Sequence, residues 1–200
     1  MFDDTYKTIS APAEGLYKEK GSKFIAYIYP VKSEVEIKEI IASLKKEHHA
    51  ARHHCYAYRL MPDKSVYRIN DDGEPNGTAG KPIYGQIQSN DLTNVLIVVV
   101  RYFGGTLLGV SGLIKAYKSA ALDAINNSEI IEKTINENIE ITCPYEQLNE
   151  VMRIIKQNKL TIIKQQSDSN LKVIVEIRKS KVEIVIGLFK NLEKVITRLV

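Results

Sequence analysis

The sequence contains no tryptophan and only two cysteines, Cys55 and Cys143, which lie far apart. Two distant thiols are typical of reduced side chains in a reducing compartment, so we expect no structural disulfide. The first residues lack the basic and apolar segments of a signal peptide, and no apolar run approaches the roughly 18 to 20 residues of a membrane helix. We therefore expect a cytoplasmic protein with no membrane partner.

The chain also has no excess of one charge sign over residues 1–137. Lys and Arg number 17 against 17 Asp and Glu over residues 1–137, whereas they number 11 against 7 over residues 138–200. The basic excess of the last third either attracts phosphate groups or an acidic protein, or it is ordinary solvated surface. Apolar residues make up 44% of the 200, which is enough for one large domain or two small ones.

Apolar periodicity predicts alternating strands and helices over residues 1–137. Two strand-like runs flank Lys20–Ser22 and predict a hairpin. Ser33 is expected to cap a helix whose apolar positions are Val35, Ile37, Ile40, Ile41 and Leu44. Further strands are expected over 53–61, 65–71, 94–102 and near 130–135, with helices from Pro82 to about Ser89 and from Leu113 to Ile125.

From about Asn138 the pattern becomes strand, helix, strand, strand, helix and a terminal strand, which is the ferredoxin-like order. Residues 167–170, Ser-Asp-Ser-Asn, supply its central turn. We therefore predict an α+β protein with an N-terminal domain over residues 1–137 and a ferredoxin-like domain over residues 138–200.

The stretch VVVRYFGGTLLGVSG, residues 98–112, joins a buried strand to a helix through a glycine-rich loop. Its four glycines, at 104, 105, 109 and 112, leave backbone N–H groups near a helix N-terminus, where an anion is electrostatically favoured. The stretch lacks the Gly-Lys-Ser/Thr of a P-loop and the order of a dinucleotide fingerprint. Two interpretations stay open: the loop binds a phosphate, or the glycines only permit positive φ and close packing.

Arg101 stands at the end of this apolar strand, where a charged side chain needs a partner or a cleft. Asp72 and Glu74 are the expected partners. One of His53 and His54 is expected to face the same cleft, where it would be a pH-sensitive group beside two carboxylates.

Two aromatic residues and a cysteine near this cleft can each be interpreted in two ways. Tyr102 and Phe103 are either core residues or a surface on which a nucleic-acid base stacks, and we expect Phe103 in the core. Cys55 is either a nucleophile with a histidine neighbour or a small buried thiol, and we expect the thiol.

Metal binding is weakly indicated. The acidic segment Asp71–Glu74 offers oxygen ligands but lacks the spacing of an EF-hand, so it is either a magnesium site or a tight Asp-Gly turn. All four histidines lie between residues 48 and 54, yet adjacent strand residues point to opposite faces and no four-ligand zinc set is complete. We predict no metal site and no cofactor.

Three stretches together resemble the IMPACT family, whose bacterial members are often called YigZ-type proteins. They are ARHHCYAY (51–58), DDGEPNGTAGKP (71–82) and VLIVVVRYFGGTLLGVSGLIKAY (95–117). The resemblance is strong over about residues 15–125, and the C-terminal module resembles the domain that accompanies it in bacterial members. The family's motif residues fall on His53, Cys55, Asp72, Gly73, Glu74, Pro75, Gly77, Thr78, Ala79, Gly80, Arg101, Tyr102, Gly104, Gly105 and Gly109.

The resemblance implies a first domain of the left-handed βαβ type found in a small-subunit ribosomal protein and in GHMP kinases, and a second domain similar to ferredoxin-like domains of elongation factor G. Eukaryotic members regulate translation by competing for an activator of a starvation-responsive initiation-factor kinase, through an additional N-terminal domain for which this chain has no room. A nucleic-acid or ribosome-linked role is usually inferred for bacterial members.

Three functions are compatible with these features. The first is a cytosolic regulator of translation that binds RNA or the ribosome, with a further protein partner in translation control. Its binding residues would be Arg101, Tyr102, Gly104, Gly105, Gly109, Gly77 and Thr78. The second is an enzyme acting on a small phosphorylated ligand, with His53, Asp72 and Glu74 as candidates for proton transfer. The third is a pure protein-interaction module.

Overall fold

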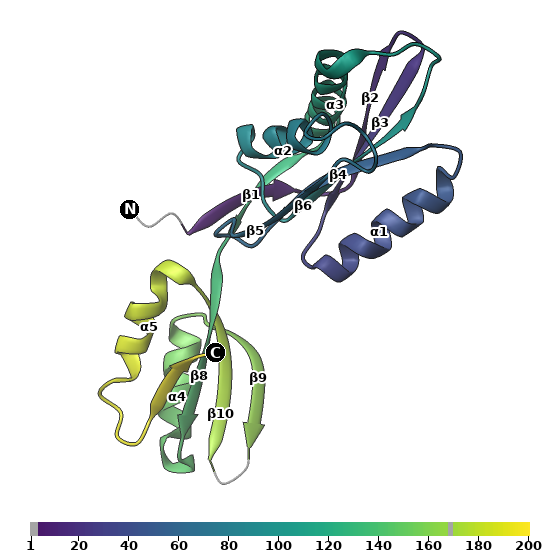
Figure 1. Cartoon of the computed structure of the whole chain (residues 1–200). Helices are drawn as coiled ribbons and strands as arrows, with labels where there is room; N and C mark the ends of the chain where they lie inside the picture. Colours follow the sequence, from purple (N-terminus) through teal and green to yellow (C-terminus); the bar gives the residue numbers. More distant parts are fainter. Residues whose placement is uncertain (1–3, 168–169) are drawn as a thin grey trace. The chain divides into compact units, whose positions relative to one another are not determined.

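The computed structural model describes residues 4–167 and 170–200, which form two compact units (Figure 1). One unit is Tyr6–Lys133, and the described residues of the other are Asp4, Thr5 and those from Thr134 onward. The mixed α and β content with several sheets confirms the predicted class in outline. The predicted division after residue 137 falls inside strand β8 (Asn136–Cys143) and stays a prediction about domains.

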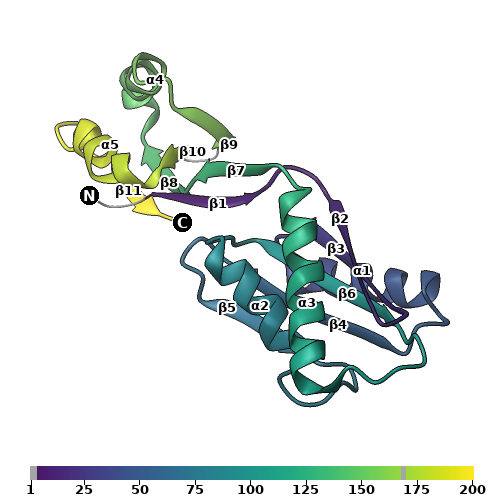
Figure 2. The ribbon, with the colours of Figure 1, turned by 90° about the horizontal axis from the view of Figure 1, so that it is seen from above.

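The first unit is built on a five-stranded sheet in the order β2-β3-β6-β4-β5, in which every neighbouring pair is antiparallel. Helices α2 and α3 lie side by side on one face of this sheet, and α1 lies on the other (Figures 1 and 2). The elements are β2 (Ala13–Glu19), β3 (Ser22–Pro30), α1 (Glu34–Glu47), β4 (His53–Leu60), β5 (Val66–Asn70), α2 (Gly80–Ser89), β6 (Val95–Tyr102) and α3 (Gly109–Asn126).

The central strand β6 is buried on both faces, as its continuous apolar run predicts. Val95, Ile97 and Val99 pack in the core under α2 and α3, whereas alternate residues of the strand pack in the core under α1. Because successive strand residues point to opposite faces, a strand between two layers needs apolar residues at every position. Arg101 is the exception at the end of this strand, and it lies on the α2/α3 face.

The C-terminal end of α3 covers part of the free edge of strand β2. The Asp123 carboxylate accepts a hydrogen bond from the backbone N–H of Leu16, and the Asn127 amide donates to the carbonyl of Glu14. These side chains occupy backbone groups that would otherwise pair with another strand. The approach is so close that a Cβ on Gly15 would lie 2.2 Å from the backbone nitrogen of Ala124.

The second unit contains a four-stranded sheet in the order β11-β8-β10-β9, again antiparallel throughout. Alternate residues of β8 and β10 pack against α4 and α5 in a core of their own. Its elements are β8 (Asn136–Cys143), the 3-10 turn Tyr145–Gln147, α4 (Leu148–Gln157), β9 (Thr161–Ser167), β10 (Leu171–Arg178), the 3-10 turn Lys179–Lys181, α5 (Val182–Phe189) and β11 (Ile196–Leu199).

Most predicted elements are present, with two differences, and one predicted turn is not tested. Ser33 accepts a hydrogen bond from the Glu36 N–H and so caps α1, but Val35, predicted on its buried face, is exposed. Strand β1 (Thr5–Ile9), which pairs with β7 (Ile130–Thr134), was not predicted. The predicted turn at residues 167–170 includes two residues outside the described part of the chain. In that described part no helix is both long and apolar enough to cross a bilayer.

Substituting Gly15→Ala is expected to destabilise the protein, because the new methyl group collides with the backbone of α3 and cannot be relieved by a rotamer change. Overpacking of this kind costs about 1–3 kcal/mol, measurable as a lower free energy of unfolding in urea. Gly85→Ala is the matched control, since a Cβ there has no neighbour within 4 Å and alanine favours the helix α2 by up to about 1 kcal/mol. Equal effects of the two substitutions would contradict the packing argument.

Candidate functional site

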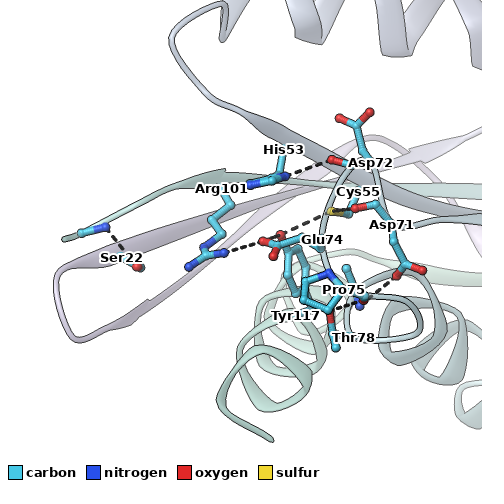
Figure 3. A network of polar contacts seen from close by, with 12 residues as sticks. Ser22, His53, Cys55, Asp71, Asp72, Glu74, Pro75, Thr78, Arg101 and Tyr117 are labelled. Atoms are coloured by element: carbon cyan, nitrogen blue, oxygen red, sulfur yellow. Dashed lines mark hydrogen bonds and ion pairs between the residues drawn. The ribbon is translucent and has the colours of Figure 1, made fainter. Parts of the chain in front are cut away.

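The centre of the candidate site is a buried ion pair between Arg101 at the end of β6 and Glu74 in the loop before α2 (Figure 3). The Arg101 Nη1 donates to Glu74 Oε1 at 2.6 Å, and the two residues are only 6% and 8% exposed. Of the two partners expected for Arg101, the structure selects Glu74. The guanidinium and the carboxylate therefore converge as predicted, but in a closed pair rather than on the walls of an open cleft.

Two aromatic rings lie within cation–π range of the Arg101 side chain. Its Cζ lies 5.5 Å from the ring centroid of Phe24 and 5.6 Å from that of Phe103, within the range of cation–π attraction. Phe24 in turn meets Tyr117 edge to face, with centroids 5.1 Å apart. The Arg101 Nε is buried and, among the described residues, has no hydrogen-bond partner.

Tyr117 and Cys55 complete the buried polar group beneath the ion pair. The Tyr117 hydroxyl donates to Glu74 Oε1 at 2.7 Å, and the Cys55 Sγ lies 3.3 Å from this hydroxyl and 3.0 Å from the carbonyl of Asp71. Burial raises the pKa of both the Tyr117 phenol and the Cys55 thiol. Cys55 is thus a neutral buried thiol, as expected, and both groups act as hydrogen-bonding parts of the core.

Asp71 closes the N-terminus of helix α2. Its carboxylate accepts hydrogen bonds from the backbone N–H groups of Gly77, Ala79 and Gly80, at 2.9, 3.0 and 2.8 Å. These are donors that a helix start leaves without partners, and a negative charge there is favoured by the helix dipole. Local sequence patterns do not indicate this role for Asp71, because the capping carboxylate stands eight residues before Ala79 rather than directly before the helix.

Gly77 and Thr78, predicted to bind a ligand, lie within this same turn. Gly77 adopts a positive φ of 76°, and Thr78 is buried with its hydroxyl donating to the carbonyl of Pro75 at 2.7 Å. Both residues are engaged in shaping the segment that carries Glu74.

Asp72 turns away from Arg101 toward β4 and α1. Its carboxylate accepts from the backbone N–H of His54 at 2.7 Å and from Lys45 at 3.2 Å. His53 faces Arg101 across the β4–β6 register and donates from Nδ1 to the Asp72 carbonyl at 2.9 Å, whereas His54 is buried toward α1. The structure therefore brings His53, Arg101 and Glu74 to one face and separates the Asp72 carboxylate from them.

Tyr102 lies on the opposite face of the sheet from Arg101. Its hydroxyl lies 2.9 Å from Nδ1 of His48, whose Nε2 lies 2.8 Å from the hydroxyl of Tyr27. This placement follows from the alternation of strand residues. Tyr102 packs against the core under α1 and does not join the residues around Arg101.

The glycine loop between β6 and α3 is exposed from Phe103 to Leu107. Gly104 fits directly against the β2–β3 hairpin, because a Cβ there would lie 1.9 Å from Gly21, and its N–H donates to the Ser22 hydroxyl at 3.1 Å. Gly105 and Gly109 have positive φ values of 87° and 71°, which side chains other than glycine rarely adopt.

The end of the loop leads into helix α3. Gly109 is the first residue of α3, and the N-cap residue Leu108 makes no side-chain capping bond. Phe103 is 54% exposed, so the prediction that it belongs to the core is wrong.

These features define a class: a two-unit protein of mixed α and β structure, in whose first unit an acidic loop is bound by an ion pair to an arginine next to an exposed glycine loop. The Impact N-terminal domain model matches residues 20–125. An IMPACT family member of Haemophilus influenzae is 36% identical over 82% of this chain and 81% of its own, and the IMPACT family member YigZ of Escherichia coli is 36% identical over 74% of each. The chain belongs to the IMPACT family, as the sequence motifs predict.

A solved structure has a similar fold. It is titled as the crystal structure of a hypothetical protein, is 30% identical, and matches with a TM-score of 0.77 over 98% of this chain and 97% of its own.

Removing the negative charge of the ion pair by Glu74→Gln is expected to lower the free energy of unfolding by about 3–5 kcal/mol, because the Arg101 charge stays buried without compensation. The double variant Arg101→Met with Glu74→Gln is expected to recover part of this loss, since neither charge then remains. Urea unfolding of the two single variants and the double variant measures the coupling. Additive losses would show that the pair is not coupled.

Acidification is expected to destabilise the protein through His54. Burial lowers the pKa of His54 below its ordinary 6.5, against the opposing effect of Asp72. The unfolded chain then binds the proton more tightly than the folded protein does. The free energy of unfolding is therefore not reduced by His54 above about pH 6.5, and it falls as the pH drops from there through the folded-state pKa. The free energy of unfolding should fall less between pH 7 and 5 in His54→Phe than in the unmodified protein. An identical pH dependence would contradict this assignment.

Proposed function

We propose that this protein is a cytoplasmic regulator of translation that binds RNA or the ribosome through the loop between β6 and α3. The observation that carries the proposal is the exposed glycine loop at the start of a helix without a side-chain cap. Backbone N–H groups at such a start favour an anion, and phosphate is the anion that RNA presents. The part played in translation rests on the family resemblance.

The charges around the loop support a nucleic-acid ligand. Lys20 and Lys23 lie at the hairpin tip against which Gly104 packs, and Lys115 and Lys118 follow on the exposed side of α3. Arg101 itself is neutralised by Glu74, so we assign it the role of positioning the loop rather than of binding phosphate directly. Residues 138–200, with 11 basic against 7 acidic side chains, would add affinity.

We further propose the fold types that the resemblance implies. For the second domain, the ferredoxin-like assignment is supported by the order βαββαβ and by the strand order β11-β8-β10-β9. For the first domain, the βαβ assignment is supported by β3 and β4, which are both antiparallel to β6 and are connected through α1.

RNA affinity is expected to fall as salt rises, with a log-log slope of about −0.7 per phosphate contacted on a single strand. Lys23→Gln should weaken binding and make that slope smaller by about 0.7. Lys38→Gln is the matched control, because Lys38 is an exposed lysine on α1, which covers the other face of the sheet. Filter binding over a series of salt concentrations measures both values, and no detectable RNA binding at low salt would reject the proposal.

A further inference from the structure

We propose that Phe103 is a platform on which one unpaired base of the ligand stacks, so that the glycine loop selects single-stranded over duplex RNA. This inference rests on the proposed RNA binding and adds to it a residue, a contact and a class of RNA.

Phe103 is an exposed aromatic ring within cation–π range of Arg101. It is 54% exposed, and the Arg101 Cζ lies 5.6 Å from its centroid. Arg101 is fixed in turn by its ion pair with Glu74, and its Cζ also lies 5.5 Å from the ring centroid of Phe24. A ring supported by an immobile cation loses little freedom when a ligand covers its exposed face, which favours binding there.

The charges near Phe103 suit a phosphate backbone. Gly104 seats the loop on the β2–β3 hairpin, whose tip carries Lys20 and whose strand β3 begins with Ser22 and the exposed Lys23. Lys115 and Lys118 add exposed positive charge on α3, the helix into which the glycine loop leads.

Two acidic side chains of this unit, Glu74 and Glu19, accept hydrogen bonds from side chains of the protein. Glu74 accepts from Arg101 and Tyr117, and Glu19 accepts from the Tyr17 hydroxyl at 2.5 Å. Glu74 is neutralised by the Arg101 cation, whereas Glu19 keeps its negative charge, so Lys20 and Lys23 are the exposed cations that a phosphate can approach at the hairpin tip. An aromatic ring beside lysines is the combination that binds single strands, because every base has a π face and every linkage has a phosphate.

A duplex does not offer the same contact. Its bases are already stacked on one another, and the deep, narrow major groove of A-form RNA keeps side chains from their edges. A base that stacks on Phe103 must be unpaired, so the single strand is preferred.

The absence of tryptophan from the sequence allows a direct test, because Phe103→Trp introduces the only indole of the chain. Adding a single-stranded RNA of mixed sequence without internal pairing is expected to quench its fluorescence to saturation. The same RNA annealed to its complement should quench much less. Tyr67→Trp is the matched control, since Tyr67 is an aromatic residue with 58% exposure on β5 at the far edge of the sheet, and its fluorescence should not change.

Affinity provides the second readout. Phe103→Leu is expected to weaken binding of the single strand by about 5- to 150-fold, whereas Phe103→Tyr retains it, as a stacking contact requires. Circular dichroism confirms that each variant is folded.

The outcomes separate the two proposals. If the unmodified protein binds RNA but the indole of the Phe103→Trp variant is not quenched and Phe103→Leu binds equally well, the platform is overturned and RNA binding stands. Equal binding and quenching by the duplex overturns the single-strand preference. If the unmodified protein binds neither RNA at low salt, both proposals fail, and the exposed apolar side chains of the loop are then better explained by a protein partner.

Discussion

The ion pair between Arg101 and Glu74 is the constraint on which the first unit depends. Removing two opposite charges from water costs several kcal/mol for each, and the cost is offset only where geometry and further hydrogen bonds are good. Glu74 meets this requirement by accepting from Tyr117 as well, and Tyr117 lies against Cys55. The Glu74 carboxylate thereby connects its loop directly to the end of β6 and the middle of α3. Through Tyr117 it is also connected to Cys55 near the start of β4.

Each of the three acidic residues of this loop contacts a different part of the first unit. Asp71 satisfies the N-terminus of α2, Asp72 connects β4 with Lys45 of α1, and Glu74 holds β6 and α3. Among the oxygens that suggested a metal site or proton transfer from the sequence, both of Asp71, both of Asp72 and Oε1 of Glu74 accept from donors of the protein itself. This arrangement favours a structural role for the acidic segment, and the exposed glycine loop is where we propose that a ligand binds.

Sequence patterns predicted β6, its buried faces, and an acidic partner for Arg101, because strand alternation and the cost of a buried charge are local or general rules. They did not decide which acid it is, since that depends on how the loop turns. Phe103 was misplaced because β6 ends at Tyr102, and strand alternation no longer fixes the direction of the next side chain. The capping role of Asp71 was missed because its partners follow at a distance along the chain.

A binding loop must be both open to its ligand and held in one conformation, and these requirements oppose each other. Glycines at positive φ open the loop but add conformational freedom that binding must remove. Here the freedom is limited at its first residues, because Gly104 is seated against the hairpin and Phe103 rests on a guanidinium that the ion pair holds in place. In the RNA binding that we propose, the buried pair would contribute without contacting the ligand, because it lowers the entropy that the exposed surface loses when it is covered.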